Sequence, residues 1–265
     1  MGHFSKRSVA VVTGGGRGIG LGIARALAGS GLKVALADVD GELANPAADG
    51  LRAEGFEAIG LALDVAEAAG WARTVADVSE WWGGIDVLVN NAGVSPRGTA
   101  ESTDEPGWDR TFAINVKGPW LGIKASLPTL KARRGAIVNI GSTRSTRPRR
   151  GLCAYGASKA GLFGLTQQVA IEYLADGVTC NMVAPGWVDT PGERLLQAAH
   201  GRPDFPAGLR NLTTPEEIGA AVVYLASEAG RRVNGIILYV DSGMHAADDV
   251  SMIYDGPDDT VTANP

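Results

Sequence analysis

Short apolar runs alternate with longer amphipathic segments along almost the whole chain. The runs are rich in Val, Ile and Leu and show little alternation with polar residues, which is typical of strands buried on both faces of a parallel sheet. We expect strands at residues 9–12, 33–38, 57–63, 86–90, 136–140, 178–184 and 235–240.

Helices are expected between these strands, because apolar residues recur there every three or four positions. The first follows residue 18, where Ile19, Ile23 and Leu27 lie four residues apart. A later one has a strong start, with Thr214 as N-cap and Pro215 in the first turn. The other helices are expected at 41–54, 67–82, 108–132 and 153–174, and the Thr214 signal opens one at 215–227. Strands that alternate with helices predict a single α/β domain with a doubly wound, parallel, seven-stranded sheet.

A glycine-rich turn separates the first expected strand from the first expected helix. It contains Gly14, Gly18 and Gly20 in the spacing G-x-x-x-G-x-G. Glycines let the backbone approach a pyrophosphate closely, and the N-terminus of the following helix offers amide donors. The spacing differs from the common G-x-G-x-x-G form, so an ordinary glycine-rich loop stays open as an alternative.

Asp38 ends the second expected strand, where the acid that binds the adenosine ribose of a dinucleotide belongs. A carboxylate there can accept hydrogen bonds from both ribose hydroxyls and repels a 2′-phosphate, which favours NAD over NADP. Asp38 could instead be a solvated residue that opens a turn. Arg17 argues the other way, because it could help to hold a phosphate.

Tyr155 and Lys159 are the most informative pair in the chain. Their spacing of four residues places both side chains on one face of the helix expected at 153–174. A phenol with a pKa of about 10 is a poor acid-base group near neutrality, and a neighbouring ammonium group lowers that pKa. Taken alone, the pair could also be a surface Tyr and a surface Lys.

Further motifs follow in a fixed order along the chain. Together with the glycine turn and the Tyr155–Lys159 pair, they resemble the motifs of the short-chain dehydrogenase/reductase family, whose fold is Rossmann-like. The resemblance runs from about residue 9 to residue 243. These motifs are Asp64-Val65, Asn90-Asn91-Ala92-Gly93, Asn115, Ser142, and Pro185-Gly186 with Asp189 and Thr190 after it.

The resemblance implies a catalytic tetrad of Asn115, Ser142, Tyr155 and Lys159. It implies that Tyr155 exchanges a proton with the substrate oxygen, that Ser142 orients this oxygen, that Lys159 also binds the nicotinamide ribose, and that Asn115 holds a water. It further implies a cofactor site, in which Thr190 contacts the carboxamide. The expected cofactor residues are Gly14, Arg17, Gly18, Ile19, Gly20, Asp38, Asp64, Val65, Asn91, Ala92, Gly93, Tyr155, Lys159, Pro185, Gly186, Val188 and Thr190.

Composition narrows the partners. The chain has 265 residues, 45% of them apolar, which suffices for the core of one domain. A net charge of −5 gives no sign of nucleic acid or of an anionic membrane surface as partner. No run is long enough to span a membrane, the first residues lack the apolar core of a signal peptide, and three scattered histidines give no support to a metal site. We expect a cytoplasmic homotetramer.

Three stretches lie outside the regular alternation. Residues 187–213 contain several Pro and Gly residues and are expected to form a substrate lid with a short helix at 193–200, although a surface excursion is the alternative. Residues 246–265 form an acidic tail whose composition favours disorder. Between Ser142 and Tyr155, four arginines crowd one loop. They could be solvated or face another subunit, with their charges meeting the acidic tail of this chain or of a neighbour. Alternatively, Arg144 could bind a carboxylate or phosphate of the substrate. Trp187 is a second candidate substrate residue.

The sequence therefore predicts an NAD-dependent oxidoreductase that transfers hydride between the nicotinamide and a secondary alcohol or ketone. Two alternatives stay open. One is an NADPH-dependent 3-ketoacyl-thioester reductase, against which Asp38 argues. The other is a non-catalytic dinucleotide-binding scaffold, against which the intact Ser142, Tyr155 and Lys159 argue.

Overall fold

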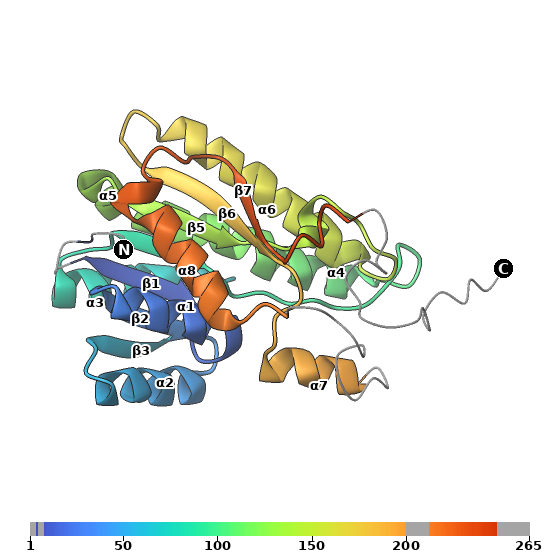
Figure 1. The fold of residues 1–265 in the computed structure, drawn as a ribbon, viewed down its shortest axis with the longest axis horizontal. Coiled ribbons are helices and arrows are strands. Elements are labelled where there is room, and N and C mark those ends of the chain that lie inside the picture. The colour runs from blue at the N-terminus through green and yellow to red at the C-terminus, as the bar shows by residue number, and fades with distance from the viewer. Residues whose placement is uncertain (1–3, 5–7, 200–211, 248–265) are drawn as a thin grey trace.

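A seven-stranded parallel sheet with the order β3-β2-β1-β4-β5-β6-β7 forms the centre of the molecule (Figure 1). The computed structural model describes residue 4, residues 8–199 and residues 212–247. The Rossmann-like fold predicted from the sequence is confirmed. The strands are β1 (Val9–Thr13), β2 (Lys33–Asp38), β3 (Ala58–Ala62), β4 (Val87–Asn90), β5 (Ala136–Ile140), β6 (Thr179–Pro185) and β7 (Ile237–Val240).

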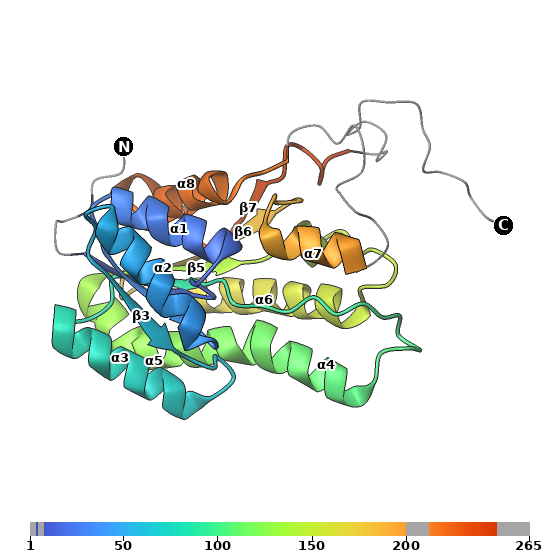
Figure 2. The same ribbon diagram turned by 90° about the horizontal axis from the view of Figure 1, so that it is seen from below.

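Helices cover both faces of the sheet, as Figure 2 shows. One face packs against α1 (Gly18–Gly29), α2 (Gly41–Ala53) and α8 (Pro215–Ala226), and the other against α3 (Ala68–Trp82), α5 (Gly118–Arg133) and α6 (Cys153–Glu172). Consecutive residues of β1 point alternately into these two cores: Ala10 and Val12 into the first, Val9 and Val11 into the second. The strand is therefore apolar at every position, as expected for a strand covered on both faces.

The N-terminus of α8 confirms the start signal of the sequence. Thr214 Oγ1 accepts a hydrogen bond from Glu217 N (3.2 Å), and Glu217 Oε2 accepts one from Thr214 N (2.7 Å). Two amides at the start of the helix are thus satisfied reciprocally. Pro215 packs tightly against α1, because a Cβ on Gly22 would lie 2.4–2.9 Å from Pro215 atoms.

The prediction of a single helix at 108–132 is wrong, because three consecutive segments occupy this region. These are α4 (Glu105–Phe112), a π-helical turn (Ala113–Lys117) and α5. Within the turn, Gly118 N donates to Ala113 O, five residues earlier. Pro119 has no N–H and so cannot donate to the Asn115 carbonyl four residues before it, which favours a wider turn there.

The short helix expected at 193–200 begins earlier, as α7 (Pro191–Ala199). Thr190 Oγ1 accepts a hydrogen bond from Glu193 N (3.1 Å) at its start. Most of the remaining lid prediction, residues 200–211, and the tail from residue 248 onward lie outside the described residues. In the described part of the chain, no helix has the length and apolar character needed to cross a membrane.

Candidate active site

The carboxyl ends of β1, β2 and β4 surround a cavity of about 610 Å³. It lies where the strand order reverses on either side of β1, which is where doubly wound proteins bind ligands. Of the residues expected to bind the cofactor, the structure brings together here Gly14, Arg17, Gly18, Ile19, Gly20, Asp38, Asp64, Val65, Asn91, Ala92, Gly93 and Thr190.

The glycine turn has a backbone that other residues could not adopt without strain. Gly14 and Gly18 have φ of +60° and +55°, in the left-handed region. A Cβ on Gly20 would overlap the Gly14 carbonyl oxygen and lie 2.6 Å from Asn91 Nδ2. The first turn of α1 therefore sits directly on the turn. Arg17 is the N-cap residue of α1, and its side chain makes no capping hydrogen bond to the backbone amides of the first turn.

Asp38 lies at the end of β2 and lines the same cavity. Its Oδ2 accepts a hydrogen bond from Gly16 N (3.2 Å), and its Oδ1 accepts one from Asp40 N (3.3 Å). These bonds orient the carboxylate toward the glycine turn. Each oxygen is an acceptor with further capacity, so both can still receive hydroxyl donors.

Asn91 ties the glycine turn to β4. Its Nδ2 donates to Thr13 O (2.8 Å) and Gly14 O (3.1 Å). Thr13 Oγ1 accepts from the backbone N–H groups of Asn91 (2.9 Å) and Ala92 (3.1 Å). The Thr13 hydroxyl thus joins the end of β1 to the end of β4. The sequence pattern did not indicate this role.

A second cavity, of about 280 Å³, adjoins the first and is lined by Ser142, Tyr155 and Lys159. Both cavities are lined by Ile19, Asn91, Gly93, Thr190 and Glu193. The smaller cavity also collects the predicted residues Pro185, Gly186, Trp187 and Val188. The structure thus brings the expected cofactor residues and three of the four expected catalytic residues into one connected site.

Different elements position the three side chains that are expected to be catalytic. Tyr155 and Lys159 lie one turn apart on α6, as their spacing predicted. Ser142 follows β5 and caps a short 3-10 turn, where its Oγ accepts from Arg144 N (3.1 Å). Ser142 also hydrogen-bonds to the Tyr155 side chain, which lowers the pKa of Tyr155. Ser142 and Tyr155 therefore face one another across the cavity.

The electrostatics around Tyr155 differ from the expectation. Burial is the largest influence and raises the pKa of Tyr155, while Arg144 and Arg97 lower it and Glu193 raises it further. Lys159 is not among these influences. Its ammonium group is 5.8 Å from the centre of the Tyr155 ring, and Nζ donates to Ile140 O (2.8 Å).

Lys159 is itself perturbed by burial, with only 5% of its surface exposed. Burial lowers the pKa of Lys159 to about 8. Its charge therefore depends on pH in the range where dehydrogenases work. Ser142, Arg144 and Arg97 thus lower the pKa of Tyr155, which is the effect that the sequence led us to expect from Lys159.

Asn115 lies outside the lining of both cavities, in the π-helical turn, and is fully buried. Its Oδ1 accepts from Val94 N (2.9 Å), and its Nδ2 donates to Val94 O (2.9 Å) and Ser158 Oγ (2.9 Å). The side chain thus fastens the segment after β4 to α6, one residue from Lys159. The sequence did not indicate this bridging role.

Arg144 also lies outside the lining of both cavities, whereas Trp187 lines the smaller one. Arg144 is partly buried, and its Nη1 donates to Arg147 O (3.3 Å). The sequence singled out Arg144 among the arginines of this loop as a candidate substrate residue, and the structure does not include it in the lining of either cavity.

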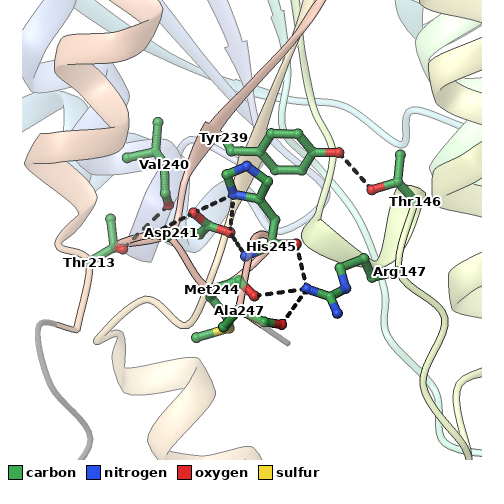
Figure 3. Close-up of polar contacts among 10 residues, drawn as sticks. Thr146, Arg147, Thr213, Tyr239, Val240, Asp241, Met244, His245 and Ala247 are labelled. Atoms are coloured by element: carbon green, nitrogen blue, oxygen red, sulfur yellow. Dashed lines mark hydrogen bonds and ion pairs between the residues drawn. The ribbon is translucent and has the colours of Figure 1, made fainter. Parts of the chain in front are cut away.

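Arg147 holds the residues that follow β7 (Figure 3). Its Nη1 donates to the carbonyls of Met244 (3.5 Å), His245 and Ala247 (2.8 Å). In the same region, Thr146 Oγ1 and Tyr239 Oη are 2.6 Å apart. We call residues 241–247 the C-terminal segment. These contacts fasten it to the loop after Ser142. A contact between the arginine loop and the acidic tail was one of the alternatives drawn from the sequence, and Arg147 meets backbone carbonyls just before and at the start of that tail.

Asp241 is the buried anchor of the C-terminal segment, with 4% of its surface exposed. Its carboxylate pairs with His245 Nδ1 (3.0 Å) and accepts from His245 N (2.7 Å) and Gly243 N (3.1 Å). The Tyr239 and His245 rings stack at 3.9 Å. Asp241 also packs on Gly186, where an added Cβ would lie 2.8 Å from Asp241 Cβ. The C-terminal segment therefore contacts a wall of the smaller cavity.

Another cavity, of about 720 Å³, lies at the opposite edge of the sheet. Ser8, Asp86 and Ala136, at the amino ends of the strands, line it. Although larger, it contains none of the residues expected to be catalytic, and ligand sites of doubly wound folds lie at the carboxyl ends.

A family model described as enoyl-(acyl carrier protein) reductase matches residues 14–245. The match spans most of the chain and both cavities. The chain belongs to the short-chain dehydrogenase/reductase family. It is an α/β oxidoreductase of the family whose members bind a nicotinamide cofactor, and the resemblance drawn from the motifs is confirmed.

Curated relatives span nearly the whole chain. A 2-(S)-hydroxypropyl-CoM dehydrogenase of Xanthobacter autotrophicus is 38% identical and covers 93% of this chain and 100% of the relative. A trans-4-hydroxycyclohexanecarboxylate dehydrogenase of Sinomonas cyclohexanicum is 35% identical, covering 91% and 94%. A solved structure from Beutenbergia cavernae, described as an NAD(P)-dependent gluconate 5-dehydrogenase with bound NADP, has a TM-score of 0.83 and 33% identity, covering 91% and 97%.

Proposed function

We propose that this protein is an NAD-dependent dehydrogenase that interconverts a secondary alcohol and its ketone. The observation that carries the proposal is the adjacency of two cavities with different chemistry. One is built from a glycine turn and a ribose-facing carboxylate, and the other contains Ser142, Tyr155 and Lys159. A dinucleotide that spans both would bring its nicotinamide beside Tyr155.

The residues present fit such a cofactor. The N-terminus of α1 has no side-chain cap from Arg17 and opens on the larger cavity, so its amides are suited to a pyrophosphate. Asp38 can accept from the ribose hydroxyls. Lys159 lies where an ammonium group could donate to the second ribose. When bound, the cofactor supplies hydride acceptance and donation.

In oxidation, Tyr155 as phenolate would take the hydroxyl proton of the alcohol, and the carbinol hydrogen would pass as hydride to a bound nicotinamide. Ser142 donates a hydrogen bond to the same oxygen and holds it against Tyr155. Arg144 and Arg97, which lower the pKa of Tyr155, favour the phenolate. The Asn115 carbonyl, which Pro119 cannot satisfy, is suited to hold a water on a proton path from Lys159 to solvent. In reduction, Tyr155 returns the proton.

NAD is favoured over NADP because of the Asp38 carboxylate. A 2′-phosphate would bring two negative groups together at the end of β2. Arg17 lines the same cavity and could offset this repulsion. Because the gluconate dehydrogenase from Beutenbergia cavernae has NADP bound, family membership does not decide the cofactor.

Two alternatives can be separated from this proposal by experiment. The family model is described as an enoyl-(acyl carrier protein) reductase, which shares the thioester substrate class of the first alternative, an NADPH-dependent 3-ketoacyl-thioester reductase. Asp38 opposes that alternative. A non-catalytic scaffold would need no facing Ser142 and Tyr155. The named relatives act on a hydroxypropyl, a hydroxycyclohexane and a gluconate compound, which supports a secondary alcohol as the substrate class.

The test is a panel of secondary alcohols assayed with NAD and with NADP, with the absorbance of the reduced cofactor as readout. Turnover with NAD on at least one alcohol, and weaker turnover with NADP, is expected. Titration of nicotinamide fluorescence gives the two affinities independently of the substrate. A protein that binds NADPH more tightly than NADH, and reduces ketoacyl thioesters alone, would support the first alternative.

We also propose a cytoplasmic homotetramer. β7 is an edge strand, and Ile171 and Leu174 at the end of α6 are 65% and 59% exposed. Exposed apolar residues and an unpaired strand edge favour association. Light scattering at micromolar concentration is expected to give four times the chain mass, and a monomer would contradict the proposal.

A further inference from the structure

The arginines between Ser142 and Tyr155 occupy different environments. Arg147 is committed to the carbonyls of the C-terminal segment (Figure 3). Arg149 and Arg150 are both exposed to solvent. Arg149 lies over the ring of Trp187, which lines the smaller cavity, with 5.9 Å between the guanidinium carbon and the ring centre. Arg144 is partly buried, and its backbone N–H donates to Oγ of Ser142 (3.1 Å), which also lines the smaller cavity. Arg144 and Arg149 are therefore each linked to the smaller cavity through a residue that lines it.

Arg144 is a partly buried cation without an acidic partner. Among the described residues, no carboxylate lies within ion-pair distance of it. Its one side-chain hydrogen bond, to Arg147 O, is long at 3.3 Å. Burial, and then Arg149, lower the pKa of Arg144. Removing a guanidinium from water in the presence of a second one costs free energy, which an anion would offset.

Arg144 is also close enough to Tyr155 to affect its ionisation. Each of the two groups shifts the pKa of the other. Arg97 acts on Tyr155 in the same direction, and backbone bonds between Gly98 and Gly151 (3.0 Å) hold its segment against the arginine loop. Arg144 and Arg97 thus both place positive charge near Tyr155.

Two acids stand against these cations. Glu193 lines both cavities and raises the pKa of Tyr155. Asp241 favours the charged form of Arg144 but is bound to His245 and to the Gly243 amide. Of the charged side chains that act on Tyr155, Arg144 and Arg97 are therefore cations and Glu193 is the carboxylate.

The position of this positive region differs from that of the cofactor site. The amides suited to a pyrophosphate belong to the glycine turn, in the larger cavity. Trp187, on which Arg149 lies, lines the smaller cavity with Ser142 and Tyr155. An anion held here would be part of the molecule whose alcohol contacts Tyr155.

We propose that Arg144 and Arg149 form a subsite for a carboxylate carried by the substrate, so that the substrate class is that of secondary hydroxy acids and the matching keto acids. The inference rests on the proposed function and deepens it. Arg144 lies just outside the lining of the smaller cavity, next to Ser142. The substrate carboxylate takes Arg144 from the long bond to Arg147 O and receives its two parallel N–H donors.

The test compares matched pairs of substrates. Secondary hydroxy acids of four to seven carbons, such as 3-hydroxybutanoate, are assayed with NAD beside their neutral amides. We expect kcat/KM to be at least about tenfold higher for the acid, as is usual for hydrogen bonds to charged groups. The KM of the acid should rise with ionic strength.

Variants locate the effect. Arg144→Ala should lower the acid-to-amide ratio of kcat/KM about tenfold or more, and Arg149→Ala should lower it less. Arg150→Ala removes the same charge from the same loop and should leave the ratio unchanged. NADH affinity should be the same in all three variants. A wild-type ratio near one, or equal losses in Arg144→Ala and Arg150→Ala, would overturn the inference.

A binding measurement separates this inference from the proposed function. If no alcohol is oxidised, the dehydrogenase proposal fails, but the protein–NADH complex can still be titrated calorimetrically with 3-hydroxybutanoate. Binding that Arg144→Ala abolishes and Arg150→Ala retains would support the subsite by itself. No binding to the wild-type complex would contradict it. Turnover of amides and acids at equal rates would leave the proposed function intact and reject the subsite.

Discussion

The two halves of the site are built in different ways. The larger cavity is formed by backbone and by residues within a few positions of strand ends, such as the glycine turn and Asp38. Around the smaller cavity, side chains join segments that are far apart in the chain, as Arg147 does with residues 244–247. The shape of the first half is set mainly by the backbone, so few side chains can change it. The second half can vary through single side chains while the sheet stays the same.

This difference predicts that changes in the two halves have separable effects. The largest is expected for Tyr155→Phe, which removes the proton donor and keeps the ring. Turnover should fall at least about a hundredfold, while NADH affinity barely changes. Steady-state kinetics and a fluorescence titration measure the two quantities.

Tyr173→Phe is the matched control for that variant. Tyr173 follows the end of α6 and lines neither cavity. Near-normal turnover in Tyr155→Phe would end the proposed mechanism. A loss of equal size in Tyr173→Phe would attribute the effect to the packing of α6.

Lys159 lines the smaller cavity, and its buried charge predicts a dependence of stability on pH. The pKa of Lys159 is about 8 in the folded protein, against 10.5 for a lysine side chain in water. Below pH 8 the folded state contains a buried charge. Between about pH 8 and 10.5 the unfolded state binds more protons, so the free energy of unfolding should rise with pH by about 3 kcal/mol.

The measurement is denaturant unfolding of the cofactor-free protein at several pH values, beside Lys159→Met. Subtracting the variant removes the contribution of all other groups. The difference between wild type and variant should increase from pH 8 to pH 10. A flat difference would show that Lys159 keeps its ordinary pKa, and a difference that falls with pH would show that folding raises this pKa. Either result would contradict the prediction.

Asp38 sharpens the comparison from the cofactor half. Replacing Asp38 by Ser and Val39 by Arg removes the repulsion of a 2′-phosphate and supplies a cation. Val39 is 72% exposed and lines the larger cavity, so an Arg side chain there has room. The ratio of kcat/KM for NAD to that for NADP should fall about tenfold or more. Turnover at saturating NADP should stay close to that of the wild type with NAD.

Val39→Gln is the control, because it lengthens the side chain without a charge and keeps Asp38. It should leave the cofactor ratio near that of the wild type. If the wild type itself prefers NADP, Arg17 outweighs Asp38, and the assignment of NAD is wrong.

The sequence predicted most of the fold and the cofactor half, because both depend on local patterns. Strands buried on both faces leave continuous apolar runs, and the Gly14–Gly20 turn requires glycines that are visible as letters. Tyr155 and Lys159 were readable for the same reason, since one helix turn fixes their relation.

The remaining features depend on contacts that no local pattern records. Arg147 donates to backbone carbonyls about a hundred residues away. Every residue type has a backbone carbonyl, so the identities of residues 244–247 do not reveal these contacts. The sequence pattern predicts an ordinary α-helix around Asn115. Pro119, which cannot donate to the Asn115 carbonyl, was a local signal for the π-helical turn found there. The perturbed ionisation of Lys159 follows from burial, which becomes apparent only when α6 is packed against β5.

The last prediction concerns Arg147, which connects the loop after Ser142 to the C-terminal segment. In Arg147→Ala, three carbonyls lose a donor, and the wall formed by Gly186 and Asp241 loses its restraint. We expect kcat/KM for the alcohol to fall about threefold to tenfold, at the scale of one charged hydrogen-bonding group. NADH affinity should stay the same, because the glycine turn and Asp38 do not contact this segment. Arg147→Lys, which keeps a donor, should recover part of the loss, and Arg150→Ala should cause none. A parallel loss of NADH affinity would show that the two halves are coupled through the C-terminal segment, and would contradict the separation argued above.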